Sequence, residues 1–131
     1  MVIDASLLDY LSRKAKESPR LRMNYDLRTS AGDGSQRMLN ALEPGTYLPV
    51  HRHRDTSETV VMVRGSVEER FYDEEGRMTE SVVLKAGSVP CALQIEKGRW
   101  HDLVCLESGT VLFEAKDGKF IPRSPEDEKQ I

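Results

Sequence analysis

Three histidines and one glutamate are the residues of this chain best suited to chemistry. The 131-residue sequence contains only three histidines: His51, His53 and His101. His51 and His53 are two positions apart, so on a β-strand both imidazole rings point to the same face. Glu58 follows five residues after His53, at the start of an apolar run. Three imidazoles and one carboxylate suit a first-row divalent metal ion and leave coordination positions free for water or substrate.

A second interpretation is that the histidines are unrelated residues of the surface or the core. The His-x-His pair alone does not decide between the two interpretations. His101 lies far along the chain, after Gly98-Arg99-Trp100. A metal site therefore requires a fold that brings distant segments together.

The elements that would position these residues are one helix and many short strands. Apolar residues recur at helical spacing from Ile3 to Ala15, and Pro19 follows the end of this pattern. Asp4 or Ser6 can cap the N-terminus of the helix. After residue 21 the pattern changes to short runs of alternating or β-branched residues, separated by turn residues. The predicted strands span residues 22–27, 38–42, 59–63, 67–72, 78–84, 91–95, 100–106 and 110–115.

This pattern predicts a single all-β domain, a sandwich or small barrel, with an N-terminal α-helix. We divide the chain into a helix packed on the barrel (residues 1–20), the barrel (21–121) and a charged tail (122–131). The tail contains proline and is expected to be poorly ordered. Five acidic residues are expected to form a solvated hairpin tip: Glu68, Glu69, Asp73, Glu74 and Glu75.

The composition argues against several classes of function. Lysine and arginine (19) are balanced by aspartate and glutamate (22), so the net charge of −3 lacks the basic surplus of a nucleic-acid-binding protein. No apolar run approaches the roughly 20 residues of a membrane span, and no secretory signal is visible at the N-terminus. We expect Cys91 and Cys105 to be buried, unreactive thiols. The prediction is a cytoplasmic protein that binds neither nucleic acid nor membrane.

The residues around the first two histidines form a recognisable motif. Gly45, His51, His53, Glu58 and Gly65 are separated by five, one, four and six residues. This segment resembles the first conserved motif of the cupin superfamily at every fixed position. The resemblance implies a double-stranded β-helix, the jelly-roll barrel of the cupins.

A second cupin motif is matched in part. Gly98 and His101 fit this motif, whereas Glu96 and Cys105 stand where it has proline and asparagine. Together the two motifs imply that His101 joins the residues of the first motif, so that His51, His53, Glu58 and His101 ligate one metal ion inside the barrel.

A narrower resemblance covers most of the chain. The N-terminal helix and residues 22–25, 36–47, 100–101 and 109–114 resemble the WbuC family of small cupin-fold metalloproteins. Members of that family are often encoded among genes for bacterial surface polysaccharides, and no reaction is securely assigned to them. The resemblance thus implies a scaffold, a metal and an association with polysaccharide biosynthesis.

Polar residues in or beside the predicted strands are candidates for a ligand pocket. If Arg22, Asn24, Arg37 and Asn40 point inward, they would bind an anionic or hydroxylated ligand, with arginine holding a carboxylate or phosphate. If they point outward, they form a solvated face. Arg22 and Arg37 are the preferred anchors for an anionic substrate.

Two aromatic residues adjoin the metal motif residues. Tyr47 and Trp100 would line the mouth of the pocket, or else pack against the barrel. Because the metal would occupy all three histidines and no second carboxylate is visible, Tyr47 or water activated at the metal is left for acid–base chemistry. We expect a six-coordinate ion with two open positions near Tyr47.

The function predicted from these features is a metal-binding cupin that acts on a small polar metabolite, a sugar or sugar acid, by chelation. The ion would be nickel, iron, manganese, cobalt or zinc. The sequence leaves open whether the protein is an enzyme, such as an isomerase or oxygenase. The main alternative is a non-catalytic small-molecule or metal-responsive binding module, and a metal-free sugar epimerase is a third. A homodimer is expected, because pairing closes the exposed sheet edges of small barrels.

Overall fold

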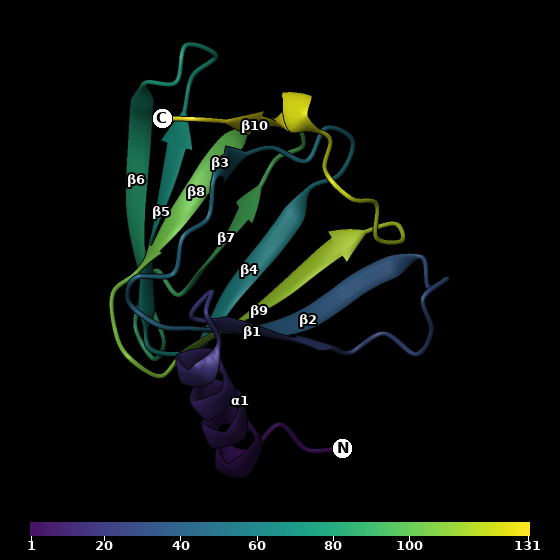
Figure 1. The fold of residues 1–131 in the computed structure, drawn as a ribbon, viewed down its shortest axis with the longest axis vertical. Helices are drawn as coiled ribbons and strands as arrows, with labels where there is room; N and C mark the ends of the chain where they lie inside the picture. Colours follow the sequence, from purple (N-terminus) through teal and green to yellow (C-terminus); the bar gives the residue numbers. More distant parts are fainter.

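Two antiparallel β-sheets of five strands each form the walls of the molecule in a computed structural model that describes residues 1–131 (Figure 1). The strand order is β1-β2-β9-β4-β7 in the first sheet and β10-β3-β8-β5-β6 in the second. This confirms the predicted all-β fold with an N-terminal helix. The strands are β1 (Arg22–Asp26), β2 (Ser35–Leu42), β3 (Val50–His51), β4 (Glu58–Arg64), β5 (Ser66–Tyr72), β6 (Met78–Lys85), β7 (Ala92–Ile95), β8 (Trp100–Cys105), β9 (Thr110–Asp117) and β10 (Glu128–Lys129).

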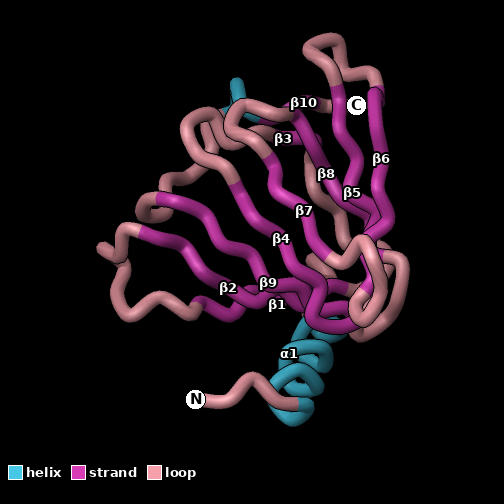
Figure 2. Tube along the Cα trace, turned by 180° about the vertical axis from the view of Figure 1, so that it is seen from behind, coloured by secondary structure: helices cyan, strands magenta, loops and turns pink.

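The helix α1 (Ala5–Glu17) covers the outer face of the first sheet (Figure 2). Asp4 caps it, because its side chain accepts a hydrogen bond from the backbone N–H of Leu7 at 3.0 Å. Two residues of its apolar stripe are fully buried against three residues of β2 and β9, and two more are partly buried there. The cluster consists of Leu11, Ala15, Leu39, Ala41 and Val111. No helix of the chain has the length and apolar composition needed to cross a membrane.

A second apolar cluster lies between the two sheets. It joins residues of β2, β4, β7 and β9 to residues of β5, β6 and β8. Because side chains alternate between the faces of a strand, β9 places Val111 against the helix and Leu112 in the barrel interior. The interior cluster consists of Leu42, Val60, Met62, Val67, Phe71, Leu84, Ile95, Cys105 and Leu112.

The C-terminal residues differ from their prediction. The expected poorly ordered tail contains a 3₁₀ turn (Pro125–Asp127) and strand β10, which pairs antiparallel with β3. Neither β3 nor β10 was predicted, because two-residue strands carry no periodic pattern of their own. The contacts that place the tail come from arginines some 75 positions earlier in the chain, as described below.

A single residue connects β4 in the first sheet to β5 in the second sheet. Gly65 links β4 to β5 with a positive φ of 78°. A Cβ atom added there would lie 2.8 Å from the Cα of Thr110, a distance that side chains do not tolerate. Gly87 has a similar φ of 74° but open space around it. The cupin-motif glycine is thus needed for both its backbone conformation and its lack of a side chain.

We predict that Gly65→Ala lowers the free energy of unfolding by more than Gly87→Ala. Both variants place alanine in the left-handed region, which costs roughly 1–2 kcal/mol. Only Gly65→Ala adds a clash with backbone, for which a further ~1–3 kcal/mol is typical. Equilibrium denaturation in urea measures both variants, and equal losses would contradict the prediction.

Candidate metal centre

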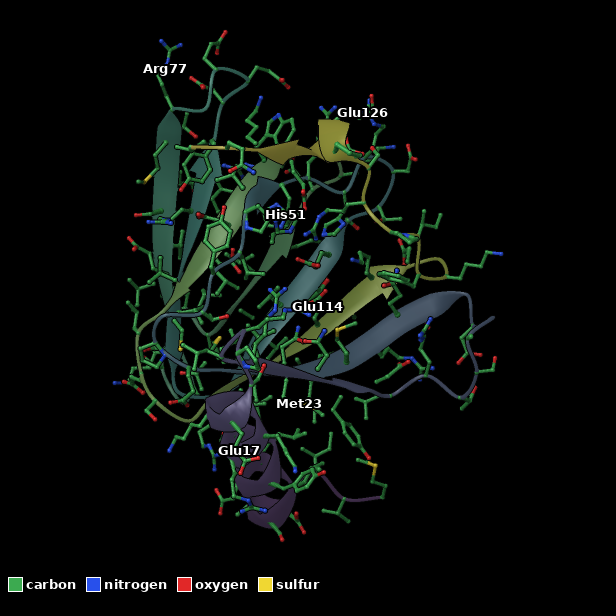
Figure 3. The ribbon with its side chains drawn as sticks, in the orientation of Figure 1. Glu17, Met23, His51, Arg77, Glu114 and Glu126 are labelled. Carbon is green, nitrogen blue, oxygen red and sulfur yellow. The ribbon has the colours of Figure 1, made fainter.

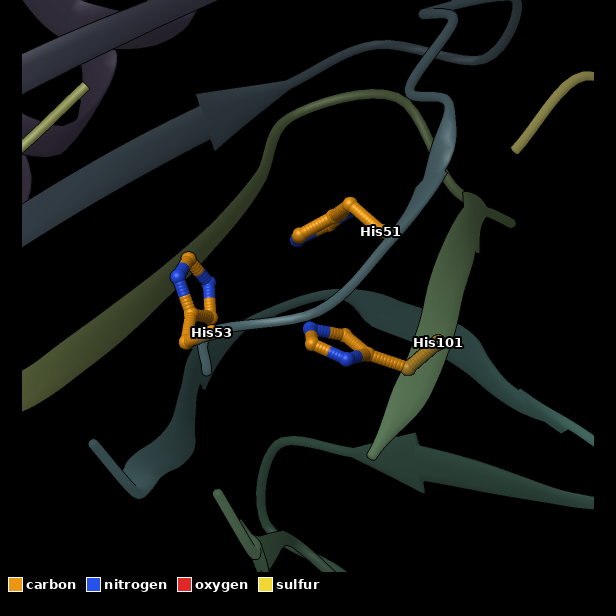
Figure 4. Close-up of side chains that lie close together, drawn as sticks. All are labelled: His51, His53 and His101. Carbon is orange, nitrogen blue, oxygen red and sulfur yellow. The ribbon is translucent and has the colours of Figure 1, made fainter. Parts of the chain in front are cut away.

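The three histidines of the chain converge on one point inside the barrel (Figure 4). His51 lies on β3 and His101 lies opposite it on β8, in register across the second sheet. β3 ends at His51, so His53 lies in the following loop rather than on the strand. The ring centroids are 4.3 Å apart for His51 and His101, 5.2 Å for His51 and His53, and 5.7 Å for His53 and His101. One candidate ligand atom from each ring lies within 4.8 Å of the others.

Backbone carbonyls fix the orientation of two of the rings. The Nδ1 of His51 is 2.9 Å from the carbonyl oxygen of Pro49, and the Nδ1 of His101 is 2.9 Å from that of Arg99. Because a carbonyl only accepts, each Nδ1 carries the proton and each Nε2 keeps its lone pair. The Nε2 of His101 is buried without a hydrogen-bond partner. This arrangement is typical of metal-binding histidines.

Burial keeps the imidazole rings neutral. It lowers the pKa of His51 to about 2 and that of His53 to about 3, and it also lowers the pKa of His101. Neutral imidazole is the form that binds a metal ion. The three rings therefore present lone pairs rather than charges.

Glu58, the first residue of β4, supplies a carboxylate next to these rings. Its Oε2 is 3.6 Å from the Nε2 of His53, and its Oε1 is 3.7 Å from the Nε2 of His101. Burial and the neighbouring Glu114 raise the pKa of Glu58. A divalent cation between these groups would offset that effect, because it favours the ionised carboxylate. The residues present therefore fit a divalent metal ion.

The histidines open onto a cavity of about 380 Å³ between the two sheets. Five buried polar atoms without hydrogen-bond partners belong to residues that line this cavity. Because these atoms face a cavity, they are able to form hydrogen bonds with a ligand or water there. The five atoms are Arg22 Nε, Gln36 Oε1, Asn40 Oδ1, Glu69 Oε2 and His101 Nε2.

Three of the polar residues singled out in the sequence line the cavity, and one does not. Arg22 and Asn24 of β1 and Asn40 of β2 are in its wall. Arg37 is not, because Gln36 lines the cavity and adjacent residues of a strand point to opposite faces. The guanidinium of Arg37 instead pairs with Asp33 at 3.2 Å.

The two aromatic candidates lie outside the cavity wall. Tyr47 is 69% exposed and borders a separate surface groove. Trp100 precedes His101 on β8 and is buried beneath two cations. The charged groups of Arg52 and Lys129 lie 4.5 Å and 4.2 Å from its ring centroid.

The structure places further charged residues in the cavity wall that sequence reasoning missed. Glu69 was predicted to belong to a solvated hairpin tip. This prediction is wrong, since Glu69 is only 1% exposed. The alternation of buried residues on β5, with Val67 and Phe71 on either side, was the signal for its inward orientation. Glu114 and Lys116 of β9 also line the cavity, and Figure 3 shows Glu114 and His51 between the two sheets.

These residues form a charged network beside the metal site. The Nδ2 of Asn40 donates a hydrogen bond to the Oε1 of Glu114 at 2.7 Å. The Nζ of Lys116 lies 3.8 Å from Glu58 Oε2, 3.9 Å from Glu114 Oε2 and 3.4 Å from the Nδ1 of His53. Lys116 thus balances part of the negative charge of the two carboxylates.

The two cysteines take no part in the site. Both are free thiols. Cys105 is buried in the interior apolar cluster, and burial raises the pKa of its thiol, which makes it less reactive. Cys91 is half-buried at the start of the β7 segment, so the prediction of burial holds fully only for Cys105.

Comparison with known families gives a match without an assigned activity. A family model described as "Domain of unknown function (DUF6016)" matches residues 3–84. No curated protein matches the chain. The narrower resemblance to the WbuC family is not supported by these comparisons.

Several solved structures share the fold. KdgF from Halomonas sp. has a TM-score of 0.62 at 16% identity, over 79% of this chain and 84% of KdgF. CapF, solved with the inhibitor 3-isopropenyl-tropolone, has a TM-score of 0.64 at 19% identity, over 76% of this chain and 28% of CapF. Oxalate decarboxylase from Bacillus subtilis, described with Mn(II) centers, has a TM-score of 0.58 at 20% identity, over 77% of this chain and 26% of the decarboxylase.

These similarities concern the fold. They confirm the predicted cupin barrel, and the chain spans most of KdgF but only about a quarter of the other two proteins. The geometry of the three histidines, which are able to hold a metal ion, is a property of this chain itself.

The buried Glu69 predicts a pH dependence of stability. Burial, reinforced by the Glu114 carboxylate, raises the pKa of Glu69 from its ordinary 4.5 to about 8. Between these values the folded protein binds more protons than the unfolded chain, so the free energy of unfolding falls as the pH rises through this range. Glu69→Gln removes the titrating group, and we expect it to stabilise the protein relative to wild type more at about pH 9 than at about pH 5.

Thermal unfolding of both proteins at the two pH values measures this difference. Glu68→Gln is the matched control, since Glu68 is half-buried and adjacent to Glu69 on the opposite face of β5. A gain for Glu69→Gln that is independent of pH, or an equal gain for Glu68→Gln, would contradict the prediction.

Proposed function

Because this chain belongs to the DUF6016 family, whose description names no activity, we propose its function from the geometry of the site. We propose that it is a metal-binding cupin in which His51, His53, His101 and Glu58 hold one divalent transition-metal ion. The observation that carries this proposal is the convergence of three neutral imidazoles, two of them oriented by carbonyl acceptors.

The donor set favours particular metals. Imidazoles and a carboxylate without a thiolate suit manganese, iron, cobalt or nickel, and these ions prefer six-coordination. Four protein ligands would then leave two positions facing the cavity. The manganese centres described for the oxalate decarboxylase with the same fold agree with this choice. Zinc would be closed by the same four ligands in a tetrahedron.

The cavity wall indicates the chemistry of the ligand. A volume of about 380 Å³ accommodates a small metabolite. The unpaired Nε of Arg22 can hold a carboxylate, while Asn24, Asn40 and Gln36 offer amide groups to hydroxyls. We therefore propose a sugar acid or a similar hydroxylated acid as the ligand.

The buried carboxyl groups favour a catalytic role over simple binding. When bound, a divalent ion acts as a Lewis acid on the oxygen atoms of a chelated ligand. Glu69 is protonated at neutral pH, since its pKa is raised to about 8, and it can donate a proton or a hydrogen bond to a ligand in the cavity. A non-catalytic binding module, in which Glu69 would only donate a hydrogen bond to the ligand, is the second candidate.

Other expectations from the sequence stay predictions. The homodimer and the cytoplasmic location rest on the sequence arguments above, and the link to polysaccharide biosynthesis rests only on the resemblance to the WbuC family. β1 and β7 form the edges of the first sheet, and β10 and β6 those of the second. These edges are the places where a second copy would pair.

We predict that His53→Ala and His101→Ala abolish stoichiometric metal binding. Each variant removes one of three imidazole ligands, and the metal-dependent rise in thermal stability should disappear with it. Elemental analysis and thermal unfolding with and without added Co²⁺ measure both effects. Asn24→Ala is the control, because it changes the cavity wall without removing a metal ligand. Full metal content in both histidine variants would refute the metal site.

We predict that Arg22 selects for an acidic ligand. In the metal-loaded protein, Arg22→Ala should weaken the binding of gluconate about tenfold, because a hydrogen bond to a charged group contributes ~1.5–3 kcal/mol. The binding of sorbitol, which has no carboxylate, should not change. Calorimetric titration measures both. Arg37→Ala, which removes an arginine outside the cavity, should bind gluconate like wild type, and an equal loss in both variants would contradict the assignment.

A further inference from the structure

We propose that residues 118–131, here called the C-terminal strap, position the metal ligands, and that Asp127 is the positioning residue that connects the two. The inference rests on the metal centre proposed above, since it concerns the affinity of that centre. It assigns a function to a segment that includes residues 122–131, which were predicted to be a poorly ordered tail.

The strap runs from the first sheet to the second across the open side of the barrel. It leaves the end of β9 and returns as β10 along the free edge of β3 (Figure 1). Within it, Phe120 and Arg123 line the cavity. Glu128 pairs with His51 across the two strands. The strap therefore contacts the strand that carries the first metal ligand.

Asp127 joins the strap to the residues on both sides of His53. Its Oδ1 accepts hydrogen bonds from the Nε of Arg52 at 2.8 Å and from the guanidinium of Arg54 at 2.9 Å. Its backbone carbonyl accepts from the N–H of Arg52 at 3.0 Å. The Oγ of Ser124 donates to its Oδ2 at 3.2 Å, which holds the carboxylate within the turn. One aspartate thus anchors the two residues that flank His53 in the loop of residues 52–57, here called the metal loop.

The contact extends to the strand of the third histidine. Arg52, held by Asp127, lies over the ring of Trp100, and Lys129 of the strap lies over the same ring. Such cation–π contacts are attractive, because the face of the ring carries negative partial charge. Trp100 adjoins His101 on β8. All three histidines are therefore within two residues of a group that the strap holds.

The metal loop needs this support because it has little structure of its own. β3 is two residues long and pairs with β8 at a single position. After it, residues 52–57 form no strand, and the carbonyl of His53 accepts from Gly98 N–H at 2.7 Å. A loop that is ordered before the metal binds does not lose conformational entropy on binding, so a pre-ordered loop binds more tightly.

Charge alone does not explain the proposed effect. The guanidinium of Arg123 faces the histidines from the strap, where its charge opposes a cation, but it is paired with Glu128 at 3.0 Å. Asp127 is neutralised in turn by Arg52 and Arg54. The strap therefore acts through geometry, and a control variant can separate this effect from electrostatics.

The experiment compares Asp127→Asn with Glu126→Gln in Co²⁺ titrations of the full-length protein followed by calorimetry. Both variants remove one negative charge from the strap. Only Asp127 forms hydrogen bonds with the metal loop. Glu126 accepts a single hydrogen bond, and it comes from Ser124 within the strap. We expect Asp127→Asn to weaken Co²⁺ binding about tenfold, as is common when a group that orients metal ligands is lost. Glu126→Gln should bind like wild type, and Asp127→Glu should recover part of the affinity.

Amide hydrogen exchange of the wild type provides the reciprocal measurement. If the strap improves metal binding, the metal must stabilise the strap to the same extent. Co²⁺ should slow exchange at the amides of residues 126–130 in wild type but not in His101→Ala. If Asp127→Asn does not fold, this measurement on its own tests whether the strap and the metal site are coupled.

The outcomes separate the two proposals. A wild type that binds no Co²⁺ refutes the metal centre. A wild type that binds Co²⁺, with Asp127→Asn of equal affinity or with strap exchange unchanged by the metal, refutes the positioning role of Asp127 and leaves the metal centre intact.

Discussion

The orientation of the imidazole rings is the constraint on which the rest of the site depends. In His51 and His101 the Nδ1 proton is held by the carbonyl two residues earlier, so both Nε2 lone pairs point inward. Burial then keeps the rings uncharged. A ring that was free to turn, or that was protonated, would offer no ligand atom at this point. The pairing of β3 with β8 exists at the one position where these two rings meet.

One part of the barrel interior is an apolar cluster that stabilises the fold, and the other part is the polar cavity of the candidate site. The apolar cluster that contains Phe71, Leu84 and Leu112 supplies the hydrophobic burial that holds the two sheets together. The rest of the interior contains polar atoms without partners, among them those of Arg22 and Glu69. These atoms face the cavity and are able to form hydrogen bonds with a ligand or water there. The apolar part therefore holds the sheets together around a preformed polar cavity.

The C-terminal strap supports the metal loop from outside the two sheets' long strands. The metal loop follows a strand of only two residues, and such a segment is ordered by its neighbours rather than by its own pattern. Asp127 reaches it from 73 to 75 positions away in the sequence. This arrangement couples the last residues of the chain to the first conserved motif, so the affinity of the metal site is a property of the whole fold.

The amino-acid sequence by itself determined the elements with a periodic pattern and the residue types of the metal site. The helical spacing up to Ala15 and the alternation of the long strands predicted α1 and most of both sheets, because these patterns report which side of an element is buried. The resemblance to two cupin motifs predicted the fold and the grouping of His51, His53 and His101. These signals are local, or depend on spacing along the chain.

Only the tertiary structure decided which polar side chains face the cavity. The sequence made Arg22 and Arg37 equal candidates for the ligand pocket, yet only Arg22 lines the cavity. The register of β1 and β2 sets which face of the sheet each residue occupies. Glu69 and Glu114 enter the site from different sheets, and Asp127 reaches the metal loop from a short 3₁₀ turn. Each of these placements is a long-range contact, and its free energy depends on burial and partners that no local pattern encodes.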